Sequence, residues 1–175
     1  MKAIVFESNT GHTERYARIL AEKLGVPCYA IKEASGSVPK GESVFFLGWV
    51  MANQICGLKK ASRLWDVRAV GAVGICPASD SNSRILAKKN KTDAPIFYLR
   101  GGVDYSKLKG LKRTLLELVR DNTARENKPE NAELVRTLTE GGDFVCEENL
   151  AGIVTFGLMQ AADCRPQIGD SEPKA

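Results

Sequence analysis

The segment Glu7–Glu14, Glu-Ser-Asn-Thr-Gly-His-Thr-Glu, carries side chains that suit the binding of an anion. Ser8, Thr10 and Thr13 supply three hydroxyls that can donate to phosphate oxygens without any lysine or arginine. The first backbone N–H groups of a helix lack intrahelical partners and favour negative charge, so a helix that begins here adds donors. Gly11 lets the chain turn tightly and approach the anion closely. The segment predicts a phosphate site, with one alternative: Ser8 or Thr10 caps the helix, and Gly11 serves only the turn.

This segment lacks the signatures of other phosphate-binding loops. No Gly-Lys-Ser/Thr follows it, which excludes a Walker A loop, and no G-x-G-x-x-G marks a dinucleotide site. A response regulator requires acidic residues clustered at strand ends, and only Glu7 is well placed. The chain shows no Ser-His-Asp or Cys-His arrangement, so we predict no catalytic side chain of these kinds. One histidine and no close cysteine pair argue against a structural zinc site, and we predict no bound metal.

Apolar segments along the chain predict the sheet that positions this loop. They are nearly continuous in apolar residues, which is typical of strands buried on both faces of a parallel sheet. Segments with helical spacing alternate with them, as in right-handed βαβ units. The predicted strands are Ala3–Phe6, Pro27–Ile31, Ser43–Gly48, Ala69–Cys76 and Pro95–Leu99. The predicted helices are Tyr16–Leu24, Leu58–Trp65, Ser83–Lys89, Leu108–Val119, Asn131–Glu140 and Glu147–Leu158.

These elements predict one α/β domain, a doubly wound parallel sheet with helices on both faces. Five strands with a helix behind most of them is the count of a flavodoxin-like domain, with the strand order 2-1-3-4-5. We expect the domain to span residues 1–160, followed by a flexible tail at 161–175. Ligands bind such sheets at the carboxyl ends of the strands. The loops that matter are therefore Glu7–Thr13, Gly48–Gly57 and Cys76–Asn82.

Three segments resemble the flavin-binding loops of flavodoxins. The phosphate-binding signature of that family, Ser/Thr-x-Thr-Gly-x-Thr, is similar to Ser8-Asn9-Thr10-Gly11-His12-Thr13, with His12 where Asn is common. The family's second flavin loop corresponds in position to Phe46-Leu47-Gly48-Trp49-Val50-Met51-Ala52, and its third to Gly74-Ile75-Cys76-Pro77-Ala78. The segment Ile96–Leu108 more particularly resembles bacterial flavodoxin-domain proteins related to menaquinone-dependent protoporphyrinogen oxidase. The similarity extends in layout from residue 2 to about residue 158.

The resemblance implies non-covalent FMN. Its phosphate would bind at Ser8–Thr13, and the edge of its isoalloxazine ring would lie between the loops at 49–54 and 76–80. Trp49 would cover one face of the ring, and a protonated His12 would assist in holding the phosphate. The cofactor-binding residues implied are Ser8, Asn9, Thr10, Gly11, His12, Thr13, Trp49, Val50, Met51, Ala52, Asn53, Cys76, Pro77, Ala78 and Ser79.

The function that the resemblance implies is electron transfer to a redox partner protein or a small-molecule acceptor. One alternative is an FMN-dependent oxidoreductase of the protoporphyrinogen oxidase type. Those enzymes carry a longer segment after strand four, whereas Ser79–Pro95 is short here, which favours the carrier. Two further alternatives are a flavin-free flavodoxin-like interaction module and an NAD(P)H-dependent FMN reductase.

Charge and composition restrict the partner and the compartment. The 175 residues have a formal net charge of +4, and residues 59–91 are the most basic region. That region is either a solvated surface or a basic rim that attracts an acidic partner. Aromatic side chains do not alternate with the basic ones, so we predict no nucleic-acid binding. No segment has the character of a transmembrane span or secretory signal, and the five cysteines form no CxxC, which together predict a cytoplasmic protein.

Overall fold

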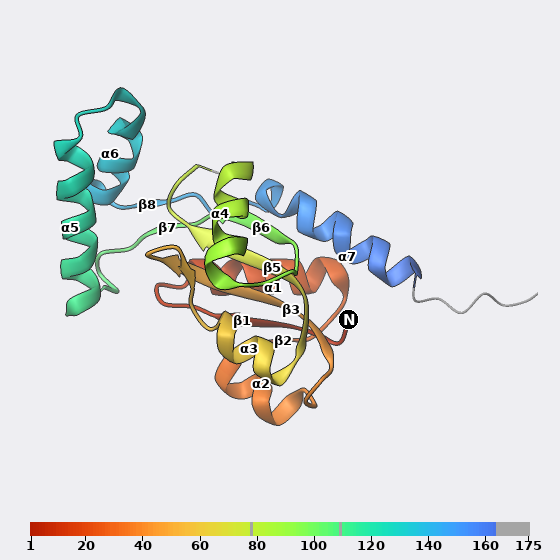
Figure 1. Cartoon of the computed structure of the whole chain (residues 1–175). Coiled ribbons are helices and arrows are strands. Elements are labelled where there is room, and N and C mark those ends of the chain that lie inside the picture. The colour runs from red at the N-terminus through yellow and green to blue at the C-terminus, as the bar shows by residue number, and fades with distance from the viewer. Residues whose placement is uncertain (78, 109, 164–175) are drawn as a thin grey trace, which may run out of the picture.

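The computed structural model describes residues 1–77, 79–108 and 110–163. Its centre is a mostly parallel sheet with helices packed on both faces, which confirms the α/β prediction (Figure 1). Helix α7 (Ala151–Asp163) continues past the predicted domain end at residue 160, and the rest of the predicted tail lies outside the described residues. In the described part of the chain, no helix is both long enough and apolar enough to cross a membrane.

The sheet consists of strands whose apolar side chains pack on both of its faces. The main strands lie in the order β2-β1-β3-β5-β6, and each neighbouring pair is parallel. A short additional strand, β4, pairs antiparallel with β3, so the sheet has six strands within the described residues and not the five predicted. The strands are β1 (Ala3–Glu7), β2 (Cys28–Ala30), β3 (Ser43–Met51), β4 (Gln54–Ile55), β5 (Asp66–Gly74) and β6 (Ile96–Arg100).

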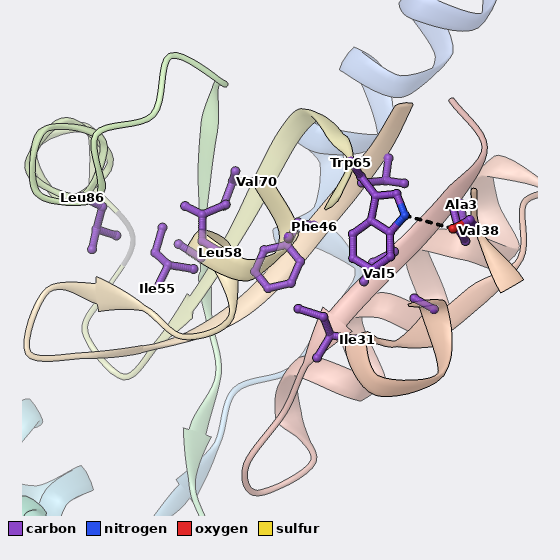
Figure 2. Close-up of a cluster of buried hydrophobic side chains, with 14 residues drawn as sticks. Ala3, Val5, Ile31, Val38, Phe46, Ile55, Leu58, Trp65, Val70 and Leu86 are labelled. Carbon is purple, nitrogen blue, oxygen red and sulfur yellow. Dashed lines mark hydrogen bonds between the residues drawn. The ribbon is translucent and has the colours of Figure 1, made fainter. Parts of the chain in front are cut away.

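Each face of the sheet is covered by its own set of helices. On one face, Phe45 of β3 is buried with Leu20 of α1 (His12–Leu24) and Ile153 of α7. The other face carries α2 (Ile31–Ser37), α3 (Leu58–Leu64) and α4 (Asp80–Asn90). Figure 2 shows the apolar side chains of this second face, with Phe46 near Leu58. Because both faces are covered by apolar packing, continuous apolar strands are the pattern that this sheet requires.

The described residues 104–108 and 110–140 form an excursion outside these layers (Figure 1). The chain leaves the body along β7 (Gly102–Val103) and returns along β8 (Gly142–Asp143). These two strands pair antiparallel, with Val103 opposite Gly142. The excursion contains helix α5 (Leu111–Arg125), the 3₁₀ turn η1 (Pro129–Asn131) and helix α6 (Ala132–Glu140); a second 3₁₀ turn, η2 (Glu147–Leu150), leads into α7.

Arg100, at the end of β6, ties the excursion to the sheet. Its guanidinium forms an ion pair with Glu133 of α6 and stacks over the ring of Phe144, 3.7 Å from the ring centroid. The hydroxyl of Tyr105 donates to the carbonyl oxygen of Leu138. The first set of contacts holds α6 against the end of β6, and the second holds α6 against the segment that precedes α5.

Tyr16 is the centre of a buried hydrogen-bond network, and we expect Tyr16→Phe to lower the free energy of unfolding by about 1–3 kcal/mol. Its hydroxyl donates to the carbonyl oxygen of Arg100 at 2.6 Å and accepts from the side-chain amide of Asn149 at 2.6 Å. Removing the hydroxyl leaves both groups without this partner. Urea unfolding measures the effect, with Tyr29→Phe, a half-buried tyrosine on β2, as the control. An unchanged urea midpoint for Tyr16→Phe contradicts the prediction.

Candidate functional site

An apolar cavity of about 380 Å³ opens where β1, β3 and β5 end, and its volume is in the range of small-molecule sites. The structure brings all three predicted loops to this place. Of the predicted cofactor-binding residues, the cavity is lined by Asn9, Thr10, His12, Thr13, Trp49, Val50, Met51, Ala52, Asn53 and Cys76. Ser8, Gly11, Pro77 and Ser79 are not among its lining residues, and Ala78 lies outside the described residues.

The first loop is closed by one of its own hydroxyls. The backbone N–H of Gly11 donates to Oγ of Ser8 at 3.2 Å, and Gly11 has a φ of 99° that favours glycine. Among the residues that the structure describes, no side-chain hydrogen bond caps α1, so the capping alternative for Ser8 and Thr10 does not hold. The first N–H groups of α1 are thus left for another acceptor. This arrangement suits an anion at the beginning of the helix.

A lysine far away in sequence lies against the same loop. Nζ of Lys107 donates to the carbonyl oxygen of Thr10 at 3.4 Å and is 3.2 Å from Oδ2 of Asp104. The sequence pattern of the loop gave no sign of this cation, because Lys107 follows β7 and reaches the loop only through the fold. Its charge, offset in part by the carboxylate of Asp104, adds to the preference of the helix terminus for an anion.

His12 is held mainly in its neutral form. Burial of the imidazole lowers its pKa below the usual 6.5, and the carboxylate of Asp143, 3.8 Å from Nε2, opposes this effect only in part. Nδ1 is 3.0 Å from the hydroxyl of Thr10. Asp143 is itself ion-paired with Arg15. A protonated His12 that assists with a phosphate is therefore disfavoured, in contrast to the expectation from the resemblance.

The pKa of His12 predicts a loss of stability in acid. The folded protein binds a proton at His12 less readily than the unfolded chain does. The contribution of His12 to the free energy of unfolding is therefore fully present above pH 6.5 and is lost as the pH falls below that value. As the chain has one histidine, NMR can follow its ring protons directly. We expect an inflection below pH 6.5, and a smaller loss of unfolding free energy between pH 7 and pH 5.5 in His12→Gln. An inflection above pH 6.5 contradicts the prediction.

The segment Gly48–Gly57, predicted as the second loop, contains a β-hairpin formed by β3 and β4. β3 continues through Trp49 to Met51, and β4 returns beside it, with Val50 opposite Ile55. The two residues of the turn, Ala52 and Asn53, both have positive φ, as a two-residue hairpin turn of type I′ requires. The hairpin holds Trp49, Val50 and Met51 in an extended strand along the cavity.

Gly48 permits the return of this hairpin. A Cβ at this position would lie 2.5 Å from the carbonyl oxygen of Cys56 and 2.9 Å from the ring of Phe46. The backbone N–H of Cys56 donates to the carbonyl oxygen of Trp49 at 2.9 Å, which closes the base of the hairpin. The close approach explains the glycine at the point where the strand leaves the core.

The third loop is anchored by Tyr98 of β6 and by the cap of α4. The hydroxyl of Tyr98 accepts a hydrogen bond from the backbone N–H of Cys76 at 3.1 Å, and burial strongly raises the pKa of this phenol. Ser79 caps α4, with its hydroxyl accepting from the N–H of Asn82 at 3.3 Å. Ser79 thus has a structural role, although it was predicted to bind the cofactor.

Sequence reasoning missed the outer wall of the cavity. Side chains of α5 form this wall, and they come from a helix whose apolar stripe does not pack on the sheet. Part of the stripe remains exposed, with Leu111 at 84% and Leu118 at 54%. The periodicity indicated an amphipathic helix but not the surface that it faces. Missed lining residues include Leu86, Tyr98, Leu115, Leu116 and Val119.

No protein-family model, curated protein or solved structure matches the chain, so its function is inferred from the site itself.

Proposed function

We propose that this chain is a flavodoxin-like protein that binds FMN non-covalently and acts in electron transfer. One observation carries the proposal: the hydroxyl-rich loop at 8–13 lies at an apolar cavity that the second and third predicted loops also line. The loop suits a phosphate, and the apolar walls suit a flat aromatic ring. The order β2-β1-β3-β5-β6 supports the same interpretation, because it is the 2-1-3-4-5 order of that fold with β4 added to β3.

The residues present suit both ends of FMN. Thr10, Thr13 and the uncapped beginning of α1 would hold the phosphate, with Lys107 adding positive charge nearby. Trp49 and Met51 of the hairpin would contact the ring and exclude water from it. Bound FMN supplies one- and two-electron redox chemistry. The protein binds and orients the cofactor, and the polarity of its surroundings tunes the redox potential.

We further propose that an acidic redox protein docks at the basic region 59–91. Arg84, Lys88 and Lys89 are exposed on α4, the helix that also lines the cavity through Leu86. Positive charge beside the opening would steer an acidic partner towards the cofactor. The rate of electron transfer to such a partner should therefore fall as the salt concentration rises.

An FMN-dependent oxidoreductase is the second candidate, and the α5 wall favours it. Leu115, Leu116 and Val119 extend the cavity beyond the three loops, and electron transfer through an exposed ring edge does not require this extension. The extra wall suits an apolar substrate beside the cofactor. Leu116→Arg separates the two functions. If the protein is an oxidoreductase, this variant should reduce an apolar quinone more slowly but ferricyanide at an unchanged rate. If the protein is a carrier, both rates should stay unchanged.

Titration of the purified protein with FMN and with riboflavin tests the proposal. We expect quenching of flavin fluorescence with an FMN dissociation constant in the micromolar range or below, and weaker binding of riboflavin because it lacks the phosphate. The ratio of the two constants reports the contribution of the phosphate site. Failure to bind FMN at micromolar concentration overturns the proposed function and favours a flavin-free interaction module.

A further inference from the structure

Asn90, the last residue of α4, makes hydrogen bonds with both ends of its side-chain amide. Its Oδ1 accepts from the backbone N–H of Ile55 at 2.8 Å. Its Nδ2 donates to the carbonyl oxygens of Asn53 at 3.0 Å and Leu86 at 2.8 Å. Two of these three bonds go to the hairpin, and the third goes to the preceding turn of α4. The side chain therefore joins the two elements directly.

The two hairpin bonds lie on the outer edge of β4. Ile55 is paired with Val50 on the inner side, so its N–H on the outer side would otherwise have no strand partner. Asn90 supplies the acceptor there and a donor for Asn53, as a neighbouring strand would. Figure 2 shows the side chain of Ile55 near Leu86, so apolar packing accompanies the polar bonds.

The elements that Asn90 joins are two walls of the cavity. The hairpin contributes Trp49, Val50 and Met51, and α4 contributes Leu86. Since Ile55 and Val50 are paired, fixing β4 also fixes the part of β3 that faces the cavity. The amide of Asn90 supplies two of the hydrogen bonds between these walls, and Nε2 of Gln54 adds a longer one to the carbonyl oxygen of Lys89 at 3.5 Å.

We propose that Asn90 is a positioning residue for the cofactor: it holds the β3–β4 hairpin against α4 and so sets the width of the cavity beside Trp49. This inference rests on the proposed function. The role needs an amide, because it uses one acceptor and two donors on one short side chain. Aspartate retains the acceptor for Ile55 but turns a carboxylate oxygen towards the carbonyls of Asn53 and Leu86.

The test compares Asn90→Ala and Asn90→Asp with Asn122→Ala and Asn122→Asp, which alter an exposed asparagine on α5. The flavin-free proteins are labelled with 5-fluorotryptophan, so ¹⁹F NMR reports on Trp49 and Trp65, and Trp49→Phe assigns the signals. We expect the Trp49 signal to shift or broaden in both Asn90 variants while the Trp65 signal stays in place. FMN affinity should fall at least tenfold in the Asn90 variants and remain unchanged in the Asn122 variants.

Urea unfolding separates positioning from general stability. A folded Asn90→Asp protein with a displaced Trp49 signal and weakened FMN binding supports the proposal, even if Asn90→Ala does not fold. Unchanged Trp49 signals overturn the proposal, and so does a displaced signal with unchanged FMN affinity. A wild-type protein that binds no FMN overturns the proposed function, and the positioning role falls with it; the NMR comparison then still shows whether Asn90 holds the hairpin.

Discussion

The combined substitution Ser8→Ala, Thr10→Ala and Thr13→Ala should weaken FMN binding at least about a hundredfold while leaving riboflavin binding nearly unchanged. A hydrogen bond to a charged group contributes about 1.5–3 kcal/mol. The loss of two such bonds therefore already exceeds the roughly 2.8 kcal/mol that a hundredfold change in affinity requires. Riboflavin has no phosphate, so its affinity reports only the apolar walls. Fluorescence titration with both flavins measures the difference.

A matched control removes three hydroxyls at other places. Ser35, Ser37 and Thr139 each donate to a helix carbonyl four residues earlier, on α2 and α6, and none of them lines the cavity. Their combined replacement by alanine should leave both flavin affinities unchanged. An equal loss of FMN and riboflavin affinity in the loop variant would indicate collapse of the loop and not loss of a phosphate site. Unchanged FMN affinity would remove the phosphate site from the proposal.

Phe46→Ala should lower the free energy of unfolding by about 3–5 kcal/mol, because it removes a fully buried ring and leaves a cavity. The total free energy of unfolding of a native protein is only about 5–15 kcal/mol, so the variant would be close to unfolding. The ring also packs beside the backbone of Gly48 and Gly57, where a Cβ would lie within 3 Å of it. The substitution therefore weakens the support of the hairpin as well as the core. Urea unfolding gives the change in free energy, and the FMN titration gives the effect on the site.

Two variants calibrate this experiment. Phe46→Leu keeps most of the apolar volume and should lower the free energy of unfolding clearly less than Phe46→Ala does. Leu111→Ala alters a leucine that is 84% exposed on α5, and we expect a change within about 0.5 kcal/mol. Should Phe46→Ala unfold at the same urea concentration as Leu111→Ala, the role of Phe46 in the core would be refuted.

The sheet and the first loop could be predicted because their causes are local. Continuous apolar strands such as Ser43–Gly48 indicate burial on both faces, and the hydroxyls around Gly11 indicate an anion site at the beginning of a helix. Both patterns are complete within a few residues. They identified the five parallel strands of the central sheet and the loop at its edge without any information on long-range contacts.

Other elements depend on contacts that no local pattern contains. The hairpin turn uses Ala52 and Asn53 at positive φ, where glycine is the usual signal, and β4 is too short to show an alternating pattern. Asn90, which bonds to the hairpin, lies on helix α4. Helix α2 was missed because only Ile31 and Ala34 are buried among its seven residues, too few to define a period. In each case the stabilising groups are distant in sequence.

The pairing of β7 with β8 has a consequence for the architecture of the chain. Because Val103 lies opposite Gly142, the chain leaves and re-enters the body at a single point. A segment with adjacent ends can be shortened, lengthened or replaced by another without altering the path of the remaining strands. The outer wall of the cavity is thus modular: exchange of residues 104–140 would give the same body a new ligand preference, and the β7–β8 ribbon is where such chimaeras should be joined.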